Sequence, residues 1–117
     1  MSKEPMSKIY LILEKIEYIE QIISQNSITE ALADAVTTRP AILMHLTAIA
    51  EQFNNLKKEN ESFLKYFDEK DVKGMYDVRT YIAHEYEGVN LAIVEWIIRH
   101  GLPKFKLQCQ DIIENEK

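Results

Sequence analysis

Apolar residues recur at helical spacing along two long stretches of the chain, from Ser7 to about Asn26 and from Thr38 to Lys57. A spacing of three or four residues places such side chains on one face of a helix. We therefore expect two long helices, each with one buried face. The expected seams are Ile9, Ile12, Ile16, Ile19 and Ile23 in the first helix, and Ile42, Leu46, Ile49, Phe53 and Leu56 in the second.

Capping residues set the expected limits of these helices. Ser27 or Thr29 can begin a short helix that ends at Ala35, because each offers a side-chain oxygen to free backbone N–H groups. Thr38 is the expected N-cap of the second long helix, since Pro40 then falls in the first turn, where a missing N–H costs nothing.

The middle of the chain predicts a connector and then another helix. The polar run NNLKKENES, residues 54–62, is expected to be the connector, and an aromatic cluster over residues 63–67 predicts one or two helical turns. A fourth helix should begin near Asp68–Asp71, where acidic side chains suit the positive end of a helix. It should run through Ile82 and stop at Gly88.

The C-terminal quarter predicts a fifth helix, NLAIVEWIIRH, with Asn90 as its cap. Gly101 and Pro103 should interrupt this helix. Beyond them an apolar stripe continues toward the C-terminus through Phe105, Cys109 and Ile112.

Three glycines, three prolines and no alternation of Val, Ile and Thr leave strands without support. We expect an all-α fold, an up-and-down bundle of four main helices plus short helices, in one domain that spans residues 1–117. Small bundles often bury surplus heptad-like apolar surface by pairing, so a homodimer is expected as well.

Composition restricts the partners and the compartment. The net charge of −5 argues against a broad nucleic-acid-binding surface, although it permits a local basic site. A lone cysteine excludes an intrachain disulfide and favours the cytoplasm, while scattered charges argue against a signal peptide or membrane span. No Cys/His/carboxylate spacing or glycine-rich loop predicts a metal ion or another cofactor.

One stretch, RTYIAHEY, carries an unusual set of polar side chains: Arg79, His84 and Tyr86. Histidine moves protons near neutral pH, and the guanidinium binds phosphate oxygens with a planar fork. The set therefore suits phosphodiester chemistry. In an ideal helix His84 lies about 140° around the axis from Arg79, so the two converge only if the helix ends or unwinds near Ala83.

A structural interpretation of the same residues stays open. Arg79 interrupts an apolar seam, which is costly unless the side chain is paired, for instance with Glu51 or Glu95. A histidine near a helix end often caps or packs rather than catalyses. His45 and His100 are expected to be structural.

The extended stretch RTYIAHEYEGVNLAIVEWII resembles the signature of the HEPN superfamily, and specifically of the HepT-like proteins: Arg, four residues, His, one residue, Tyr. The context GMYDVRTYIAHEYEGVN, Trp96 and the pair Leu102–Pro103 are similar to that group as well. AIAEQFNNL resembles the group's glycine–glutamate helix, with Glu51 at the acidic position. The resemblance covers about Ile9 to Ile113.

This resemblance implies the toxin of a type VII-like toxin–antitoxin system, a metal-independent endoribonuclease that cleaves RNA at a composite site on a dimer interface. It implies that His84 acts as base or acid and that Arg79 orients the phosphate. A minimal nucleotidyltransferase antitoxin would neutralise the toxin by adding AMP to Tyr86. Thr80 stands where the family usually has an amide, and Ala50 where it has glycine. The alternative is a non-catalytic partner or substrate-binding module of a minimal nucleotidyltransferase.

Overall fold

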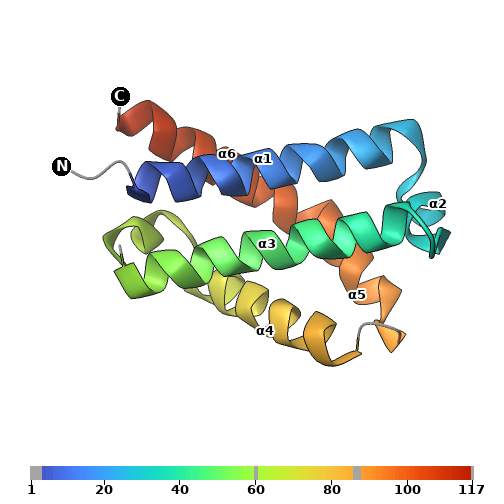
Figure 1. Cartoon of the computed structure of the whole chain (residues 1–117). Coiled ribbons are helices and arrows are strands. Elements are labelled where there is room, and N and C mark those ends of the chain that lie inside the picture. Colours follow the sequence, from blue (N-terminus) through green and yellow to red (C-terminus); the bar gives the residue numbers. More distant parts are fainter. Residues whose placement is uncertain (1–3, 60, 86–87, 117) are drawn as a thin grey trace.

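A computed structural model describes residues 4–59, 61–85 and 88–116 of the chain (Figure 1). Within those ranges the regular structure is entirely helical, which confirms the all-α prediction. The elements are α1 (Glu4–Gln25), α2 (Ile28–Ala33), α3 (Thr38–Glu59), the 3₁₀-helix η1 (Glu61–Tyr66), α4 (Glu69–Glu85), α5 (Leu91–Trp96), the π-helical turn η3 (Ile97–Gly101) and α6 (Leu102–Asn115).

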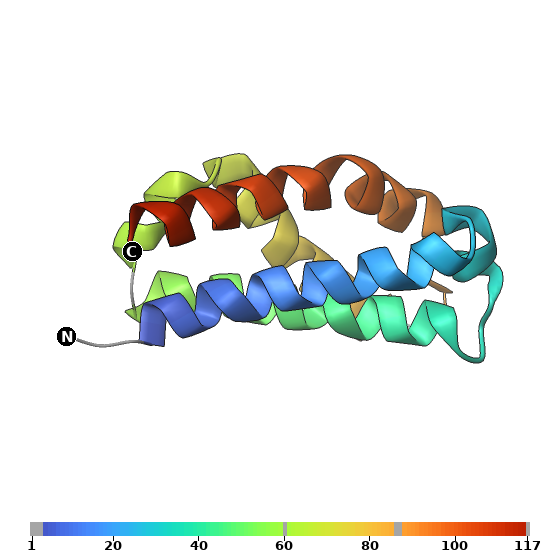
Figure 2. The ribbon, with the colours of Figure 1, turned by 90° about the horizontal axis from the view of Figure 1, so that it is seen from above.

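Four main helical segments form an up-and-down bundle. Helix α3 packs against both α1 and α4, and α6 packs against α1 (Figures 1 and 2). The N-terminal end of α1 and the C-terminal end of α6 lie at the same end of the bundle (Figure 1). Helix α3 thus lies between α1 and α4.

The predicted seams form the core. Ile9, Ile12, Ile16 and Ile19 of α1 are fully buried, and so are all five predicted seam residues of α3. Apolar side chains of α4, α5 and α6 join them in one cluster. Nine of the ten predicted seam residues are fully buried inside the subunit and Ile23 is partly buried, so these seams offer little apolar surface to a dimer.

The predicted connector begins too early. Helix α3 continues to Glu59, so Asn54–Glu59 is helical rather than irregular. The reason is that Leu56 is fully buried and extends the seam, and that Lys and Glu are good helix formers. The mostly buried Lys8 of α1 also pairs with Glu59, at 3.1 Å.

Ser27, and not Thr29, begins the short helix α2. Its hydroxyl accepts a hydrogen bond from the Glu30 N–H at 3.0 Å, and the Glu30 carboxylate accepts one from the Ser27 N–H at 3.2 Å. These two bonds form a capping box, which satisfies two donors that the helix itself cannot use. The helix ends at Ala33, two residues before the predicted Ala35.

The turn before α3 is held by Asp34 rather than by the predicted cap Thr38. The Asp34 carboxylate accepts hydrogen bonds from the N–H groups of Val36 and Thr37 at 2.9 and 3.0 Å, and from the Thr37 hydroxyl. Thr38 is already helical, and its hydroxyl donates to the Ala31 carbonyl at 2.5 Å. An Asx turn at Asp34 therefore satisfies the backbone N–H groups before α3, in place of the cap predicted at Thr38.

Acidification should weaken this turn. The Thr37 hydroxyl, followed by the backbone donors, lowers the pKa of Asp34 from 3.8 to about 2 in the folded protein. A lowered pKa means that the carboxylate stabilises the fold above about pH 4, and that this contribution is lost as the pH falls toward 2. Asp34→Ala should lower the midpoint of thermal unfolding near neutral pH, and the difference from wild type should shrink over that window. Asp111→Ala, at an exposed position of α6, is the control; a difference for Asp34→Ala that does not change with pH would contradict the assignment.

The predicted interruption at Gly101 and Pro103 takes the form of a π-helical turn. Helix α5 runs through η3 into α6, and the Leu102 N–H donates to the carbonyl of Ile97, five residues back. Pro103 lacks an N–H and would leave a helical carbonyl without its usual partner. A π turn with five-residue spacing accommodates such a break while the chain stays helical.

Candidate active site

Helix α4 holds the candidate catalytic residues. The carboxylate of Asp68 accepts a hydrogen bond from the Lys70 N–H at 3.0 Å, and acidic residues occupy the first turn, as predicted. At the other end, the Tyr81 hydroxyl accepts a hydrogen bond from the Asn90 N–H at 2.6 Å. This bond ties the last turns of α4 to the start of α5. The exposed side chains of Arg79, Thr80 and His84 lie on the second half of the helix.

Tyr86, the expected site of AMP addition, lies outside the described residues, as does Glu87. The described part of α4 ends one residue before it, at Glu85.

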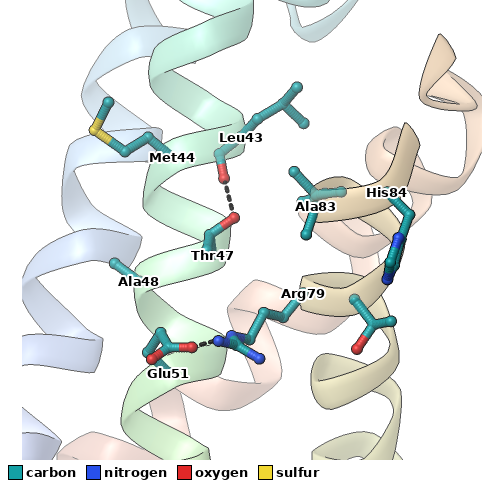
Figure 3. A pocket seen from close by; sticks show the side chains of 10 residues that line it. Leu43, Met44, Thr47, Ala48, Glu51, Arg79, Ala83 and His84 are labelled. Carbon is teal, nitrogen blue, oxygen red and sulfur yellow. Dashed lines mark hydrogen bonds and ion pairs between the residues drawn. The ribbon is translucent and has the colours of Figure 1, made fainter. Parts of the chain in front are cut away.

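Arg79 pairs with Glu51 across the two helices α4 and α3 (Figure 3). The Nε of Arg79 contacts Oε1 of Glu51, and the side chains are 48% and 39% exposed respectively. The other expected partner, Glu95, instead pairs with Arg99 at 2.8 Å. A guanidinium held by one acid still presents its remaining N–H groups to solvent, so it can bind a phosphate.

This ion pair should contribute little to stability. An ion pair between side chains that are this exposed is typically worth about 0.2–1 kcal/mol, because water screens it. The free energy of unfolding in urea can be measured for wild type, Arg79→Ala, Glu51→Ala and the double variant. This double-mutant cycle should give a coupling free energy below about 1 kcal/mol. A coupling of several kcal/mol would show that the pair is a structural element of the bundle. The cycle Lys73→Ala and Asp77→Ala, on an exposed pair of α4 at 3.2 Å, is a matched control.

An open groove lies on the surface between the packed helices α3 and α4, and we call it the α3–α4 groove. Its volume is about 650 Å³, within the range of ordinary ligand sites. The lining residues come from the two helices only: Leu43, Met44, Thr47, Ala48 and Glu51 from α3, and Arg79, Thr80, Ile82, Ala83 and His84 from α4.

Arg79 and His84 line this groove from different sides of α4. The helix does not unwind near Ala83, so the two residues keep the separation of about 140° that an ideal helix imposes. Figure 3 shows the side chain of Arg79 reaching toward α3, while that of His84 lies on the other flank of α4. Within one subunit the two groups do not converge on a single point.

The two threonines of the groove use their hydroxyls inside their own helices. The Thr80 hydroxyl donates to the Tyr76 carbonyl at 3.3 Å, and the Thr47 hydroxyl to the Leu43 carbonyl at 2.9 Å. Such bonds to a carbonyl four residues back are common for helical threonine. Thr80 thus does not offer a ligand the two amide donors of an asparagine.

Other reactive side chains lie apart from this groove. Burial raises the pKa of the Cys109 thiol to about 12, so it stays protonated and is a poor nucleophile. His100 is exposed and its ring contacts that of Trp96 at a tilt, with ring centroids 5.2 Å apart. Among the described residues, no group of three or more His, Cys, Asp and Glu is placed to hold a metal ion. In the same ranges no helix is long and apolar enough to span a membrane.

Of the wall that α3 contributes to the groove, the sequence predicted Glu51 alone. Met44 is 68% exposed at the edge of the groove, beside Thr47 and Ala48. Together with Glu51 these residues repeat at three- and four-residue spacing, one or two positions away from the core seam. A second stripe of that kind is the signal that could have identified the wall.

Comparison with known proteins identifies the same family that the RTYIAHEY motif resembles. A family model described as "Ribonuclease HepT-like" matches residues 12–112. A protein named "Putative RNase" from Caldanaerobacter subterraneus subsp. tengcongensis is 30% identical over 115 residues, covering 98% of this chain and 99% of that protein. Another "Putative RNase", from Methanocaldococcus jannaschii, is 27% identical over 113 residues, covering 97% and 90%. No solved structure matches significantly. The chain therefore belongs to the HepT-like ribonuclease family.

Proposed function

We propose that this protein is the toxin of a type VII-like toxin–antitoxin system, a metal-independent endoribonuclease of the cytoplasm. The observation that supports this most directly is that Arg79 and His84 line one open groove in a chain of the HepT-like ribonuclease family. We further propose that residues 1–117 form a single HEPN-like domain, because the described helices share one hydrophobic core.

His84 is the proton-transfer group in this proposal. Its exposed imidazole takes the proton of the ribose 2′-hydroxyl as the 2′-oxygen attacks the adjacent phosphorus. The bond from phosphorus to the 5′-oxygen then breaks, and the leaving oxygen receives a proton from an imidazolium or from water. The products are a 2′,3′-cyclic phosphate and a 5′-hydroxyl, and no water is consumed in this step.

Arg79 stabilises the charge that builds up on the phosphate oxygens. The guanidinium keeps its charge at any physiological pH and offers several N–H donors in one plane. Glu51 positions this group by holding Nε, which leaves the outer edge of the fork directed to the groove. His84 supplies proton transfer and Arg79 supplies charge stabilisation, the two tasks that a metal ion performs in other nucleases.

A homodimer would resolve the separation between the two groups. Because Arg79 and His84 face different flanks of α4, a second subunit docked along this helix can bring the partner's His84 toward Arg79. The exposed Met44 at the groove edge offers apolar area for such a contact. The composite site at the dimer interface is thus part of the proposal.

RNA cleavage is tested by the chemistry of the ends. Purified protein incubated with single-stranded RNA and EDTA should release fragments with 2′,3′-cyclic phosphate ends, detected by mass spectrometry. Products with a 5′-phosphate, or activity that disappears with EDTA, would contradict a metal-independent transesterification.

AMP addition to Tyr86 by a minimal nucleotidyltransferase is the proposed neutralisation. A phosphate-bearing group two residues from His84 in the sequence would compete for the phosphate site and repel RNA. Co-expression with a minimal nucleotidyltransferase should add one or more AMP units to the intact mass and abolish cleavage. Tyr86→Phe should gain no mass while remaining toxic; modification at Tyr81 instead would contradict the assignment.

The alternative is a non-catalytic partner or substrate-binding module of a minimal nucleotidyltransferase. One observation favours it: the Thr80 hydroxyl is bound to the helix, so this position lacks the usual amide donors. That protein would still dimerise and accept AMP, but it would cleave no RNA. Thr80→Asn separates the two cases, because a gain of RNA cleavage in this variant alone would favour the alternative for the natural chain.

A further inference from the structure

A second depression lies between α1 and α3, which we call the α1–α3 pocket. It is lined by Tyr18, Gln21, Ile22 and Gln25 from α1 and by His45 from α3, and its volume is about 320 Å³. The rings of Tyr18 and His45 lie 5.3 Å apart at an angle of 47°. The Lys15 ammonium is 5.2 Å from the centre of the Tyr18 ring. None of these residues belongs to the α3–α4 groove.

The side chains of the α1–α3 pocket have the chemistry that recognises an unpaired nucleobase. Single-stranded bases stack on Tyr and His rings and are read by hydrogen bonds along their edges. Among the described residues, no hydrogen bond occupies the side-chain amides of Gln21 and Gln25. Each amide offers donors and an acceptor, which suits the edge of a base.

His45 and Lys15 add a polar group and a cation. Partial burial, and to a lesser extent the nearby Lys15 charge, lowers the pKa of His45. Its imidazole is therefore neutral at physiological pH, with one nitrogen that donates and one that accepts. Lys15 has a long contact of 3.8 Å with Glu14 and lies over the Tyr18 ring, which leaves its charge beside the pocket for a phosphate.

The α1–α3 pocket lies beside the α3–α4 groove, with α3 as the ridge between them. His45 follows Met44, which lines the groove, and it lies about 60° around the helix from Ala48, which also lines it. Along the helix axis His45 lies about 1.5 Å from Met44 and about 4.5 Å from Ala48. A helix with its side chains is about 10–12 Å wide, so a short single strand can cross α3 from one depression to the other.

We propose that the α1–α3 pocket is a specificity subsite that binds a base of the single-stranded RNA whose scissile phosphate lies in the α3–α4 groove, stacking it on Tyr18 and His45 and contacting its edge with Gln21 and Gln25. This inference rests on the proposed ribonuclease function. It assigns a role to His45, which sequence reasoning treated as structural, and to a set of residues far from the motif in the sequence.

The test measures RNA binding without cleavage. Fluorescence anisotropy with labelled single-stranded homopolymer RNA is recorded for the His84→Ala protein, and then for the same protein with Tyr18→Ala, Tyr18→Phe or Tyr10→Ala. Losing one stacked base should weaken binding about ten-fold for Tyr18→Ala. Tyr18→Phe keeps the ring and should keep the affinity. Tyr10, 52% exposed two turns earlier on α1, is the matched control and should have no effect.

The paired amides are tested by base preference. Gln21→Ala with Gln25→Ala should reduce the difference in affinity among the homopolymers about ten-fold. In the cleaving protein the same changes should raise KM and leave kcat unchanged. Equal effects of Tyr18→Ala and Tyr10→Ala would overturn the subsite, and so would free AMP that binds as tightly as RNA, since the pocket would then serve a mononucleotide.

The two proposals fail separately. Should the wild type cleave no RNA while the His84→Ala protein still binds RNA through Tyr18, the subsite stands and the nuclease proposal fails. Should the wild type cleave RNA with a KM that Tyr18→Ala does not change, the subsite fails and the nuclease proposal stands. Thermal unfolding of each variant checks that it is folded, and the variant with Gln21→Ala and Gln25→Ala keeps the test valid if Tyr18→Ala does not fold.

Discussion

His84→Ala is expected to lower the rate of RNA cleavage by about 10²–10⁴-fold, the usual contribution of a group that transfers protons in the transition state. Expression of the variant should also no longer arrest growth. His84 is exposed in the last turn of α4, so removing its side chain should change the free energy of unfolding by less than about 0.5 kcal/mol. Kinetics on purified protein, together with urea unfolding, separates loss of chemistry from loss of fold.

His100→Ala is the matched control for that experiment. His100 is also exposed and helical, and its ring contacts Trp96 outside the α3–α4 groove. It should keep both cleavage and growth arrest. A His84→Ala protein that remains fully toxic would remove the catalytic role of this residue, whatever the behaviour of His100→Ala.

The largest effect on stability is expected at Phe53. Its ring is fully buried, with ring centroids 4.9 Å from those of both Phe67 and Phe105. These contacts join α3 to the segment after η1 and to α6. Truncation to alanine removes the buried surface and leaves a cavity, which together cost about 3–5 kcal/mol. Since domains of this size are stable by about 5–15 kcal/mol, Phe53→Ala could unfold at ambient temperature.

Urea unfolding followed by circular dichroism measures this loss, with Phe63→Ala as the control. Phe63 is only partly buried and stacks on Tyr66 at 6.4 Å between ring centroids. Its truncation should cost about 1 kcal/mol, near the average for a point substitution. Equal losses for the two variants would mean that the three-phenylalanine cluster does not hold the bundle together.

The long helices could be predicted because their buried residues repeat with a clear period. Periodicity does not show where a helix stops. The two largest differences between the predicted and the observed helices are accordingly at helix ends. The polar residues after Phe53 suggested a connector, yet Leu56 kept the seam buried and α3 went on to Glu59. Gly101 and Pro103 suggested a break, yet a π turn accommodates the missing N–H of Pro103 and the chain stays helical.

For the site, the motif named the side chains but could not give their neighbours. The cost of an unpaired arginine on an apolar seam predicted an acidic partner for Arg79, and Glu51 and Glu95 fitted equally well. The packing of α3 on α4 makes Glu51 the partner, while Glu95 pairs with Arg99. The α1–α3 pocket had no local signal at all. Tyr18 and His45 are 27 positions apart in the sequence, and only the crossing of two helices brings them together.

The pairing of Arg79 with Glu51 also affects how RNA binding should respond to salt. A free surface arginine that contacts a phosphate lets condensed cations leave the RNA, so each such contact steepens the decline of log Kobs with log salt by about one unit. Arg79 carries its own counterion in the form of a carboxylate on the neighbouring helix. When a phosphate binds the remaining N–H groups of Arg79, the negative charge of Glu51 stays beside it in the groove and retains a cation there. The contribution of Arg79 to that slope is then smaller than one unit, and in the Glu51→Gln protein it returns to the full value.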